Sequence, residues 1–298
     1  MDNVAIVVVT YNRKNLLAEC IDALLSQTYE KFDLLIFDNA STDGTEEVVK
    51  NFQDKRIRYN NTGANLGGAG GFAFGMNYAL KENKYKYIWL MDDDTIPNKY
   101  ALESLCAKAN KMNDEFSFLA SVVKWTDGNA CLMNVQSPSP DAIKNMYAID
   151  LKLIEIRKSS FVSCFINAYC ATEVGLPIKE FFIYGDDSEY TQRLAKVKKG
   201  YLDLDSVVTH KMGSNLQIGL DCCPEDRIDR YFYGRRNGVY IARKGSVKDK
   251  ARFIWRSLKL LVSIFKKAPS KKGKRLYIFV RGTFAGLVFN PPIIKEFK

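Results

Sequence analysis

Long apolar runs are missing from this sequence. No stretch reaches the roughly 18 uninterrupted apolar residues that span a bilayer, so the sequence predicts no transmembrane helix. The opening MDNVAIVVVTYN has an acid at position 2 and only a short apolar run, so we expect a buried first strand there rather than a signal peptide. Internal repeats and low-complexity segments are also missing, which excludes a repeat protein.

Regular cysteine spacing is missing as well. The chain has seven cysteines but no CxxC pair and no even framework, which argues against a zinc ribbon or a secreted disulfide scaffold. Free thiols in a reducing cytosol are expected instead. With 298 residues, 47% of them hydrophobic, the chain can bury a substantial core in one large domain or two smaller ones.

The net positive charge is confined to the last part of the chain. Residues 244–298 hold fifteen lysines and arginines and two acids, so their net charge is +13. The net charge of the whole chain is +10, so the remaining residues carry a net charge of −3. Nucleic-acid-binding proteins usually place basic charge on the folded recognition surface, so no nucleic-acid partner is expected. We place a boundary near residue 240, with a main domain over 1–240 and a basic amphipathic helical tail over 241–298.

The tail has apolar residues near helical spacing with basic residues between them. These apolar residues are Phe253, Leu258, Leu261, Ile264 and Phe265. Such a segment suits an anionic membrane surface, which predicts peripheral association with the inner face of the cell membrane from the cytoplasm. The alternative is that the tail helices pack on the main domain or form an oligomer interface; the oligomeric state stays open.

Strand and helix patterns alternate along the first hundred residues. Apolar runs of strand length occupy 4–10 and 32–41, and residues 13–27 between them have helical spacing. Similar patterns predict helices at 42–53 and from about Gly70 to residue 83, and strands at 56–61, 85–91, 116–125 and 159–171, with a loop or small insertion at 134–145. The alternation predicts an α/β fold whose mostly parallel sheet is covered by helices on both faces.

Acidic residues gather where ligands bind in such sheets. The stretch WLMDDDTIP places Asp92, Asp93 and Asp94 directly after a predicted strand, and Thr10 and Asp38 end two others. Three adjacent carboxylates repel one another, so a bound cation is one explanation. The alternative is a solvated loop that caps the following helix.

Two later segments favour the cation. YGDDSEYTQRL contributes the acids Asp186, Asp187 and Glu189, and a strand-like segment ends at His210, the only histidine of the chain. A lone histidine is more often structural than a metal ligand, so these segments alone do not decide between the two explanations.

The ordered motifs together resemble the family 2 inverting glycosyltransferases, whose fold is the GT-A fold. The resemblance covers about residues 3–245 and rests on VVVTYNR, FDNASTDGT, WLMDDDT, YGDDSEYTQRL and YFYGRRNGVYIARK. It implies a Rossmann-like GT-A domain, here followed by the basic helical extension, and transfer of a sugar from a nucleotide-sugar donor with inversion of the anomeric configuration.

The resemblance also implies roles for individual residues. Asp92, Asp94 and His210 would hold a divalent metal, Mn²⁺ or Mg²⁺, and the imidazole favours Mn²⁺. Asp187 would be the catalytic base. Donor contacts would come from Thr10, Asn12, Arg13, Asp38, Asn65, Gly68, Asp92 and Asp93, and acceptor contacts from Tyr184, Asp186 and Glu189. Plain structural readings stay open for three of these: an exposed helix-opening residue for Arg13, a similar one for Asn65, and a helix-terminal acid for Asp186.

Within the family, the chain most resembles bacterial galactofuranosyltransferases. The resemblance rests on NLGGAGGFAFGM, the full DDD and YGDDSEY, and it implies UDP-galactofuranose as donor and a saccharide or lipid-linked saccharide of cell-surface polysaccharide synthesis as acceptor. The chain is smaller than the polymerising members and has Tyr184 and Gly185 where a tryptophan often precedes the acid pair.

Several alternatives stay open at this point. The donor could instead be dTDP-rhamnose or UDP-glucose. A non-catalytic sugar-nucleotide-binding module and a membrane or nucleic-acid adaptor are alternatives of another class. Arg235, Arg236 and Asn237 would either close over the nucleotide or bind lipid phosphates.

Overall fold

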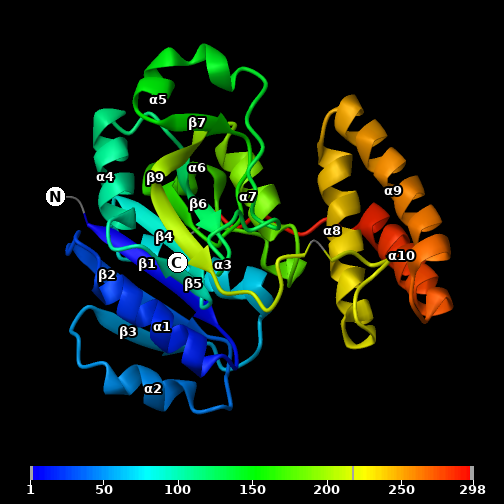
Figure 1. Ribbon diagram of the computed structural model, residues 1–298, viewed down its shortest axis with the longest axis horizontal. Helices are drawn as coiled ribbons and strands as arrows, with labels where there is room; N and C mark the ends of the chain where they lie inside the picture. Colours follow the sequence, from blue (N-terminus) through cyan, green and yellow to red (C-terminus); the bar gives the residue numbers. More distant parts are fainter. Residues whose placement is uncertain (1–2, 217, 296–298) are drawn as a thin grey trace. The chain divides into compact units, whose positions relative to one another are not determined.

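A computed structural model describes residues 3–216 and 218–295, and the strands of these residues form a mixed β-sheet (Figure 1). Within these residues the sheet has nine strands in the order β3-β2-β1-β4-β8-β6-β9-β5, with β7 paired to β9. The strands are β1 (Val4–Thr10), β2 (Phe32–Asp38), β3 (Ile57–Asn61), β4 (Tyr87–Asp92), β5 (Thr95–Pro97), β6 (Phe118–Lys124), β7 (Leu153–Ile156), β8 (Cys164–Asn167) and β9 (Gly200–His210). Pairing is parallel from β3 to β4 and mixed beyond, because β8 runs antiparallel to both β4 and β6.

Helices cover both faces of the sheet, as the alternation predicts. On one face Leu17 and Leu105 join a buried core, and on the other Met76 and Leu194 join a second one. The helices of these layers are α1 (Lys14–Leu25), α2 (Thr45–Asn51), α3 (Gly67–Lys81), α4 (Ala101–Lys111), α5 (Met146–Asp150), α6 (Ala168–Val174) and α7 (Asp186–Leu194). A mixed α/β sheet between helical layers confirms the predicted fold class.

Helix α3 lies unusually close to the sheet because it carries glycines where it crosses β1. A Cβ added at Gly75 would lie 2.5 Å from Val7 Cγ1, and one at Gly71 would lie 2.5 Å from Val9 Cγ1. The helix begins at Gly67, three residues earlier than the expected Gly70, and the Asn65 side chain accepts a hydrogen bond from the backbone of Gly67 (2.9 Å).

The chain forms two compact units. The sheet unit comprises the chain up to Lys179, Asp187–Asn215 and the chain from Ile293; the helical unit comprises Glu180–Asp186 and Leu216–Pro292. The helical unit contains α8 (Tyr231–Lys244), α9 (Val247–Lys267) and α10 (Lys272–Val288). It has a hydrophobic core of its own that includes Ile228, Ile264 and Ile278.

This division differs from the predicted boundary near residue 240, which would separate α8 from the tail. Two glycines of α10 explain the difference, since they allow α10 to pack closely on α8. A Cβ added at Gly286 would lie 2.6 Å from Val239 Cβ, and one at Gly282 would lie 2.8 Å from Arg235 Cβ. Across the described residues, none of the helices is both long enough and apolar enough to cross a membrane.

Candidate metal centre at the sheet edge

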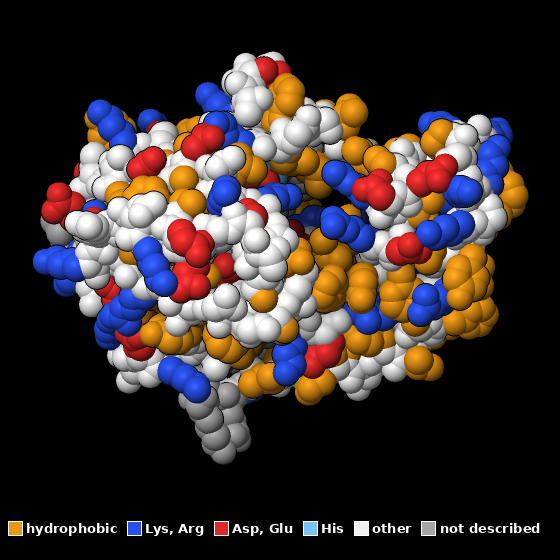
Figure 2. Space-filling view, turned by 90° about the horizontal axis from the view of Figure 1, so that it is seen from below, with side chains coloured by type: hydrophobic (Ala, Val, Ile, Leu, Met, Phe, Trp, Pro, Cys, Tyr) orange, Lys and Arg blue, Asp and Glu red, His pale blue; other side chains and the backbone are white. Residues whose placement is uncertain are grey.

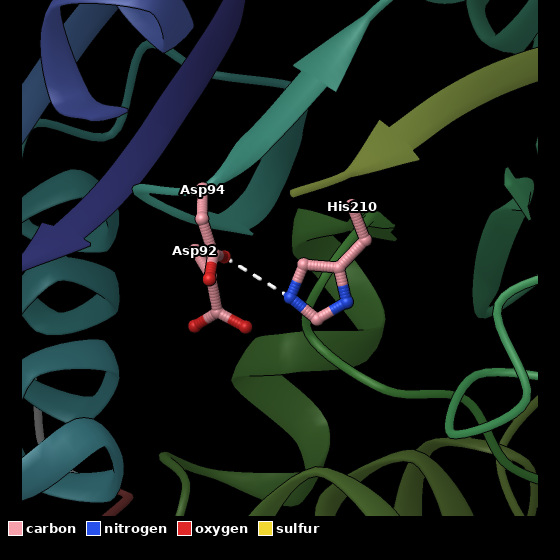
Figure 3. A group of neighbouring side chains, drawn as sticks. All are labelled: Asp92, Asp94 and His210. Carbon is pink, nitrogen blue, oxygen red and sulfur yellow. Dashed lines mark ion pairs between the residues drawn. The ribbon is translucent and has the colours of Figure 1, made fainter. Parts of the chain in front are cut away.

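Three side chains that are distant in the sequence converge at the carboxyl end of β4. Asp92 ends β4, Asp94 lies in the turn before β5, and His210 ends β9. The antiparallel pairing of β5 with β9 sets Thr95 opposite His210. One possible ligand atom from each of Asp92, Asp94 and His210 lies within 4.8 Å of the others (Figure 3).

The three aspartates make different contacts. Asp94 Oδ1 lies 3.0 Å from His210 Nε2, and Asp94 Oδ2 accepts a 2.7 Å hydrogen bond from Arg13. Asp93 accepts hydrogen bonds from Thr10 Oγ1 at 2.8 Å and from Arg13 at 3.3 Å. Because Asp93 and Asp94 are 4% and 5% exposed, a solvated loop does not describe this segment.

The imidazole of His210 is held from its other side by Asn134. The Asn134 Oδ1 atom lies 2.9 Å from Nδ1 and can only accept, so Nδ1 carries the proton and Nε2 faces Asp94. Asn134 is itself fixed by a 3.0 Å contact with Cys131 Sγ and by a 2.9 Å hydrogen bond that it donates to Ser160. The sequence carries no signal for this residue, which lies in a segment expected to be a loop.

Burial and like charge shift the titration of the cluster. Burial raises the pKa of Asp92 to about 7, and the neighbouring charge of Asp94 adds to the shift. Burial likewise raises the pKa of Asp93 to about 6, against the opposing effect of Arg13. Burial alone would raise the pKa of Asp94, but His210 and Arg13 outweigh it and hold that pKa below its usual value.

The pKa of His210 shifts in the opposite direction to that of an imidazole that is only buried. Burial alone would lower its pKa, but the carboxylates of Asp94 and Asp92 outweigh this and raise it. The site therefore concentrates negative charge, which the Arg13 guanidinium and the protonated form of the His210 ring partly offset. Two carboxylates and an imidazole form a ligand set that suits a divalent cation such as Mn²⁺ or Mg²⁺.

The first two strand ends form the neighbouring part of this edge. Thr10 of β1 pairs in register with Asp38 of β2. Asp38 is buried and accepts hydrogen bonds from the Tyr59 hydroxyl (2.6 Å) and the Ser41 backbone (2.8 Å). Asn12, whose φ is 53°, accepts a 2.8 Å bond from the backbone of Thr42. These bonds brace the loops that follow β1 and β2 against each other.

The start of α3 is the other place where the sequence predicts contacts with the nucleotide-sugar donor. The Asn65 side chain accepts a hydrogen bond from the Gly67 backbone, and buried Asn39 donates a 3.0 Å hydrogen bond to the Gly67 carbonyl. A Cβ added at Gly68 would meet no atom within 4 Å, so the space beside the first turn of this helix is open. Backbone N–H groups of such a first turn can bind phosphate or hydroxyl oxygens.

Asp187 lies in the first turn of α7 and is partly buried. Burial raises its pKa, although a 2.5 Å hydrogen bond from the Ser188 backbone and the charge of Lys158 oppose the shift. Glu189 forms a largely buried 2.7 Å ion pair with Arg193, while its Oε2 has no hydrogen-bond partner among the described residues.

The two other expected acceptor residues belong to the helical unit. Tyr184 and Asp186 lie in the segment 180–186. Tyr184 has a φ of 68°, and its ring stacks on Tyr231 with ring centres 5.4 Å apart. Asn237 of α8, fully buried, holds this segment by donating to three of its carbonyls, those of Phe181, Ile183 and Tyr184.

Arg236 holds the same segment by donating a 2.5 Å bond to the carbonyl of Glu180. Within the helical unit, Arg236 and Asn237 therefore bind backbone carbonyls. These contacts give Arg236 and Asn237 a structural role. They are explained without assuming that either residue closes over the nucleotide or binds lipid phosphates.

Comparison with known proteins places these observations in a family. The family model described as Glycosyl transferase family 2 matches residues 5–147. Galactofuranosyltransferase GlfT1 of Mycobacterium tuberculosis is 29% identical over 281 residues, which cover 85% of this chain and 88% of that protein.

Two solved structures share the fold at low sequence identity. GalNAc-T7 with UDP, GalNAc and Mn²⁺ aligns with a TM-score of 0.66 and 13% identity over 85% of this chain, and the match covers only half of that longer chain. The mannosyltransferase PcManGT from Pyrobaculum calidifontis, in complex with GDP-Man and Mn²⁺, aligns with a TM-score of 0.59 and 14% identity over 96% of this chain and 87% of its own. The order of the motifs, the GT-A architecture and the match to the family model agree, and they identify residues 5–147 as a glycosyl transferase family 2 domain.

Proposed function

We propose that the protein is a metal-dependent inverting glycosyltransferase that moves galactofuranose from UDP-galactofuranose to a saccharide or lipid-linked saccharide acceptor. The observation that carries the proposal is the convergence of Asp92, Asp94 and His210 at the sheet edge that also holds Thr10 and Asp38. In α/β sheets this edge is where nucleotides bind.

The donor would lie along this edge. Asp38 would contact the base, and Arg13, whose side chain is half exposed, would contact the diphosphate together with Asn12 and Thr10. Asn65 and Gly68 would face the sugar or a phosphate from the first turn of α3. Asp92, Asp94 and His210 would hold the divalent cation, which when bound offsets the charge that develops on the departing diphosphate.

The transfer step assigns one role to Asp187. An acceptor hydroxyl oxygen forms a bond to the anomeric carbon while the bond from that carbon to the diphosphate oxygen breaks, and UDP leaves from the opposite face. The hydroxyl proton passes to the Asp187 carboxylate. Burial raises the pKa of Asp187, which makes it a stronger base than an exposed aspartate. Displacement from the opposite face inverts the anomeric configuration.

The donor assignment rests on the similarity to GlfT1, whose name states that it transfers galactofuranose. A test is to incubate the protein with UDP-galactofuranose, UDP-glucose and dTDP-rhamnose, each with and without Mn²⁺, and to measure released nucleotide. We expect the fastest metal-dependent release from UDP-galactofuranose. With a saccharide acceptor present, NMR of the glycoside product should show the inverted anomeric configuration. A faster reaction with one of the other two donors would reject this donor, and a retained configuration would reject the mechanism.

A binding experiment separates an enzyme from an adaptor. UDP affinity is measured calorimetrically with and without Mn²⁺ for the natural chain and for Asp94→Ala. We expect Mn²⁺ to strengthen UDP binding in the natural chain only, since the variant lacks one of the three ligands. If Mn²⁺ leaves the UDP affinity of the natural chain unchanged, the metal-dependent site is rejected.

Peripheral membrane association is also part of the proposal. Helix α9 exposes large apolar side chains at helical spacing, each more than half exposed: Ile254, Trp255, Leu258, Val262 and Phe265. Figure 2 shows apolar side chains beside lysines and arginines on the helical unit. Ile264, which the sequence placed with this apolar set, is instead buried in the core of the helical unit.

The association can be tested on the full chain with phosphatidylglycerol vesicles. We expect sedimentation with the vesicles at low salt and release at high salt, because basic residues contribute about 1 kcal/mol each near an anionic surface. The double variant Trp255→Ser, Phe265→Ser should sediment less. Ile143→Ser, which changes an apolar residue that is 79% exposed in the sheet unit, is the control. Equal sedimentation of all three proteins would reject α9 as the contact.

A further inference from the structure

The helical unit contains a pocket of about 420 Å³, within the size range of small-ligand sites. Its walls come from α8 and α9 and from the segments around Tyr184 and Leu220, so every lining residue belongs to the helical unit. The pocket is distinct from the Asp92, Asp94 and His210 cluster, which lies in the sheet unit.

Arg235 brings a positive charge into this pocket without an acidic partner. Its Nε donates to Thr283 Oγ1 and its Nη1 to Ser257 Oγ, each at 2.7 Å. Its guanidinium also lies over two rings, 3.9 Å from the centre of Phe279 and 4.8 Å from that of Phe253. The hydroxyls and rings orient the guanidinium but do not neutralise its charge. Among the described residues, none accepts a hydrogen bond from Nη2.

Arg275, a buried arginine of the helical unit, differs from the partly buried Arg235. Arg275 is completely buried, and it donates to the carbonyls of Ser270, Leu220 and Cys223 and to the Cys223 sulfur. Such a set ties backbone segments together, and the complete burial of Arg275 keeps a ligand from reaching it. Burial lowers the pKa of Arg235 to about 10, so it still carries its charge at neutral pH.

A second cation lies at the same pocket. Arg256 of α9 lines it and is exposed to solvent. Among the described residues that line the pocket, none is acidic. Two guanidinium groups without a carboxylate suit a phosphoryl group, whose oxygens match the fork of N–H donors.

The rest of the pocket is apolar. The stacked rings of Tyr184 and Tyr231 form part of it, and Leu220, Phe253 and Leu260 add aliphatic and aromatic surface. A free phosphate ion would leave this surface uncovered, whereas a purely apolar molecule would leave the charge of Arg235 unpaired. A ligand that is anionic at one end and apolar at the other satisfies both parts of the pocket.

We propose that this pocket binds a phosphorylated amphiphile, with its phosphoryl group on Arg235 and Arg256 and its apolar chain against Tyr184 and Leu260. In the proposed reaction the amphiphile is the lipid part of a lipid-linked acceptor, and this assignment of the pocket rests on the proposed function. Binding of the amphiphile itself needs neither donor nor metal, so it can be measured separately.

The test is calorimetric titration of the full chain with farnesyl phosphate below its micellar concentration, without Mn²⁺ or nucleotide. Farnesol and inorganic phosphate are titrated in parallel to separate the two halves of the ligand. Arg256→Gln is the main variant, because Arg256 is exposed and its loss should not affect folding; Arg235→Gln is the second. Arg252→Gln, one turn away on α9 and not among the lining residues, is the matched control.

We expect saturable one-to-one binding of farnesyl phosphate that weakens about tenfold in each pocket variant, as the loss of one charge-assisted hydrogen bond predicts. Arg252→Gln should bind like the natural chain, and farnesol and phosphate should each bind at least about tenfold more weakly. Equal weakening in Arg252→Gln would show non-specific attraction and overturn the site. Farnesol or phosphate binding as tightly as farnesyl phosphate, or no saturable binding, would also overturn it.

Failure of the pocket and failure of the proposed function give different results. Asp94→Ala should lose transfer and keep its affinity for farnesyl phosphate, since Asp94 lies in the sheet unit. Arg256→Gln should keep the Mn²⁺-dependent affinity for UDP. A loss of farnesyl phosphate binding in Asp94→Ala would contradict an independent pocket.

Discussion

Asn134→Ala should weaken metal binding although Asn134 is not itself a ligand. In the structure its Oδ1 lies 2.9 Å from His210 Nδ1, and the two residues are 8% and 7% exposed. Removing this acceptor frees the imidazole to rotate and to place its proton on Nε2, the atom that would bind the metal. Loss of such a partner typically lowers metal affinity by about 10- to 100-fold, which corresponds to about 1.4 to 2.8 kcal/mol.

The assay is calorimetric titration with Mn²⁺ at saturating UDP, with metal-free thermal melting as a check on folding. Asn134→Asp should recover most of the affinity, because a carboxylate oxygen still accepts the Nδ1 proton. Asn129→Ala removes an exposed side-chain amide whose hydrogen bond within the described part of the chain goes to Asp127, and this variant should bind Mn²⁺ like the natural chain. The reasoning is refuted if Asn134→Ala binds Mn²⁺ as tightly as the Asn129→Ala control.

Three further predictions concern the metal ligands, the base and the packing of α3. Asp94→Ala should abolish transfer with Mn²⁺ present, since it removes one of the three proposed ligands; wild-type turnover and metal dependence would reject the assignment. Asp187→Asn should lower turnover roughly 10²-fold or more at unchanged donor affinity. In the natural chain, turnover should fall as the pH drops through the raised pKa of Asp187, because only the unprotonated carboxylate accepts a proton; a pH-independent rate would contradict this. Gly75→Ala should cost about 1–3 kcal/mol in urea denaturation, since its Cβ would meet Val7 at 2.5 Å, whereas Gly68→Ala meets nothing within 4 Å; equal stability of the two variants would refute the packing argument.

Elements with continuous apolar runs could be predicted closely from the sequence. The strands expected at 4–10 and 32–41 are β1 and β2, because their residues are buried almost throughout. The segment 159–171 was harder to predict, since its apolar character suits both strand and helix. It forms β8 and then α6, and the change occurs where the Asn167 side chain accepts a hydrogen bond from the Tyr169 backbone and caps the helix.

The convergence of Asp92, Asp94 and His210 could be predicted because aspartates and the single histidine stand at strand ends, where parallel and antiparallel pairing bring them together. Asn134 could not be predicted, since its role depends on how a non-periodic segment returns to the sheet edge. The extent of the helical unit was difficult to predict for the same reason. Its extent depends on the close approach at Gly282 and Gly286 and on the bonds from Asn237 to residues 181–184, which no local pattern reveals.

The interleaved chain path between the two units has a consequence for how the protein is made. The chain changes unit after Lys179, Asp186, Asn215 and Pro292. On the ribosome, residues 180–186 emerge well before Asn237, which binds their carbonyls. At about 5–20 residues per second, that segment waits several seconds for its partner. The helical unit therefore cannot complete its fold as an independent module, and a gene fusion or exchange that moved only residues 216–292 would leave part of it behind.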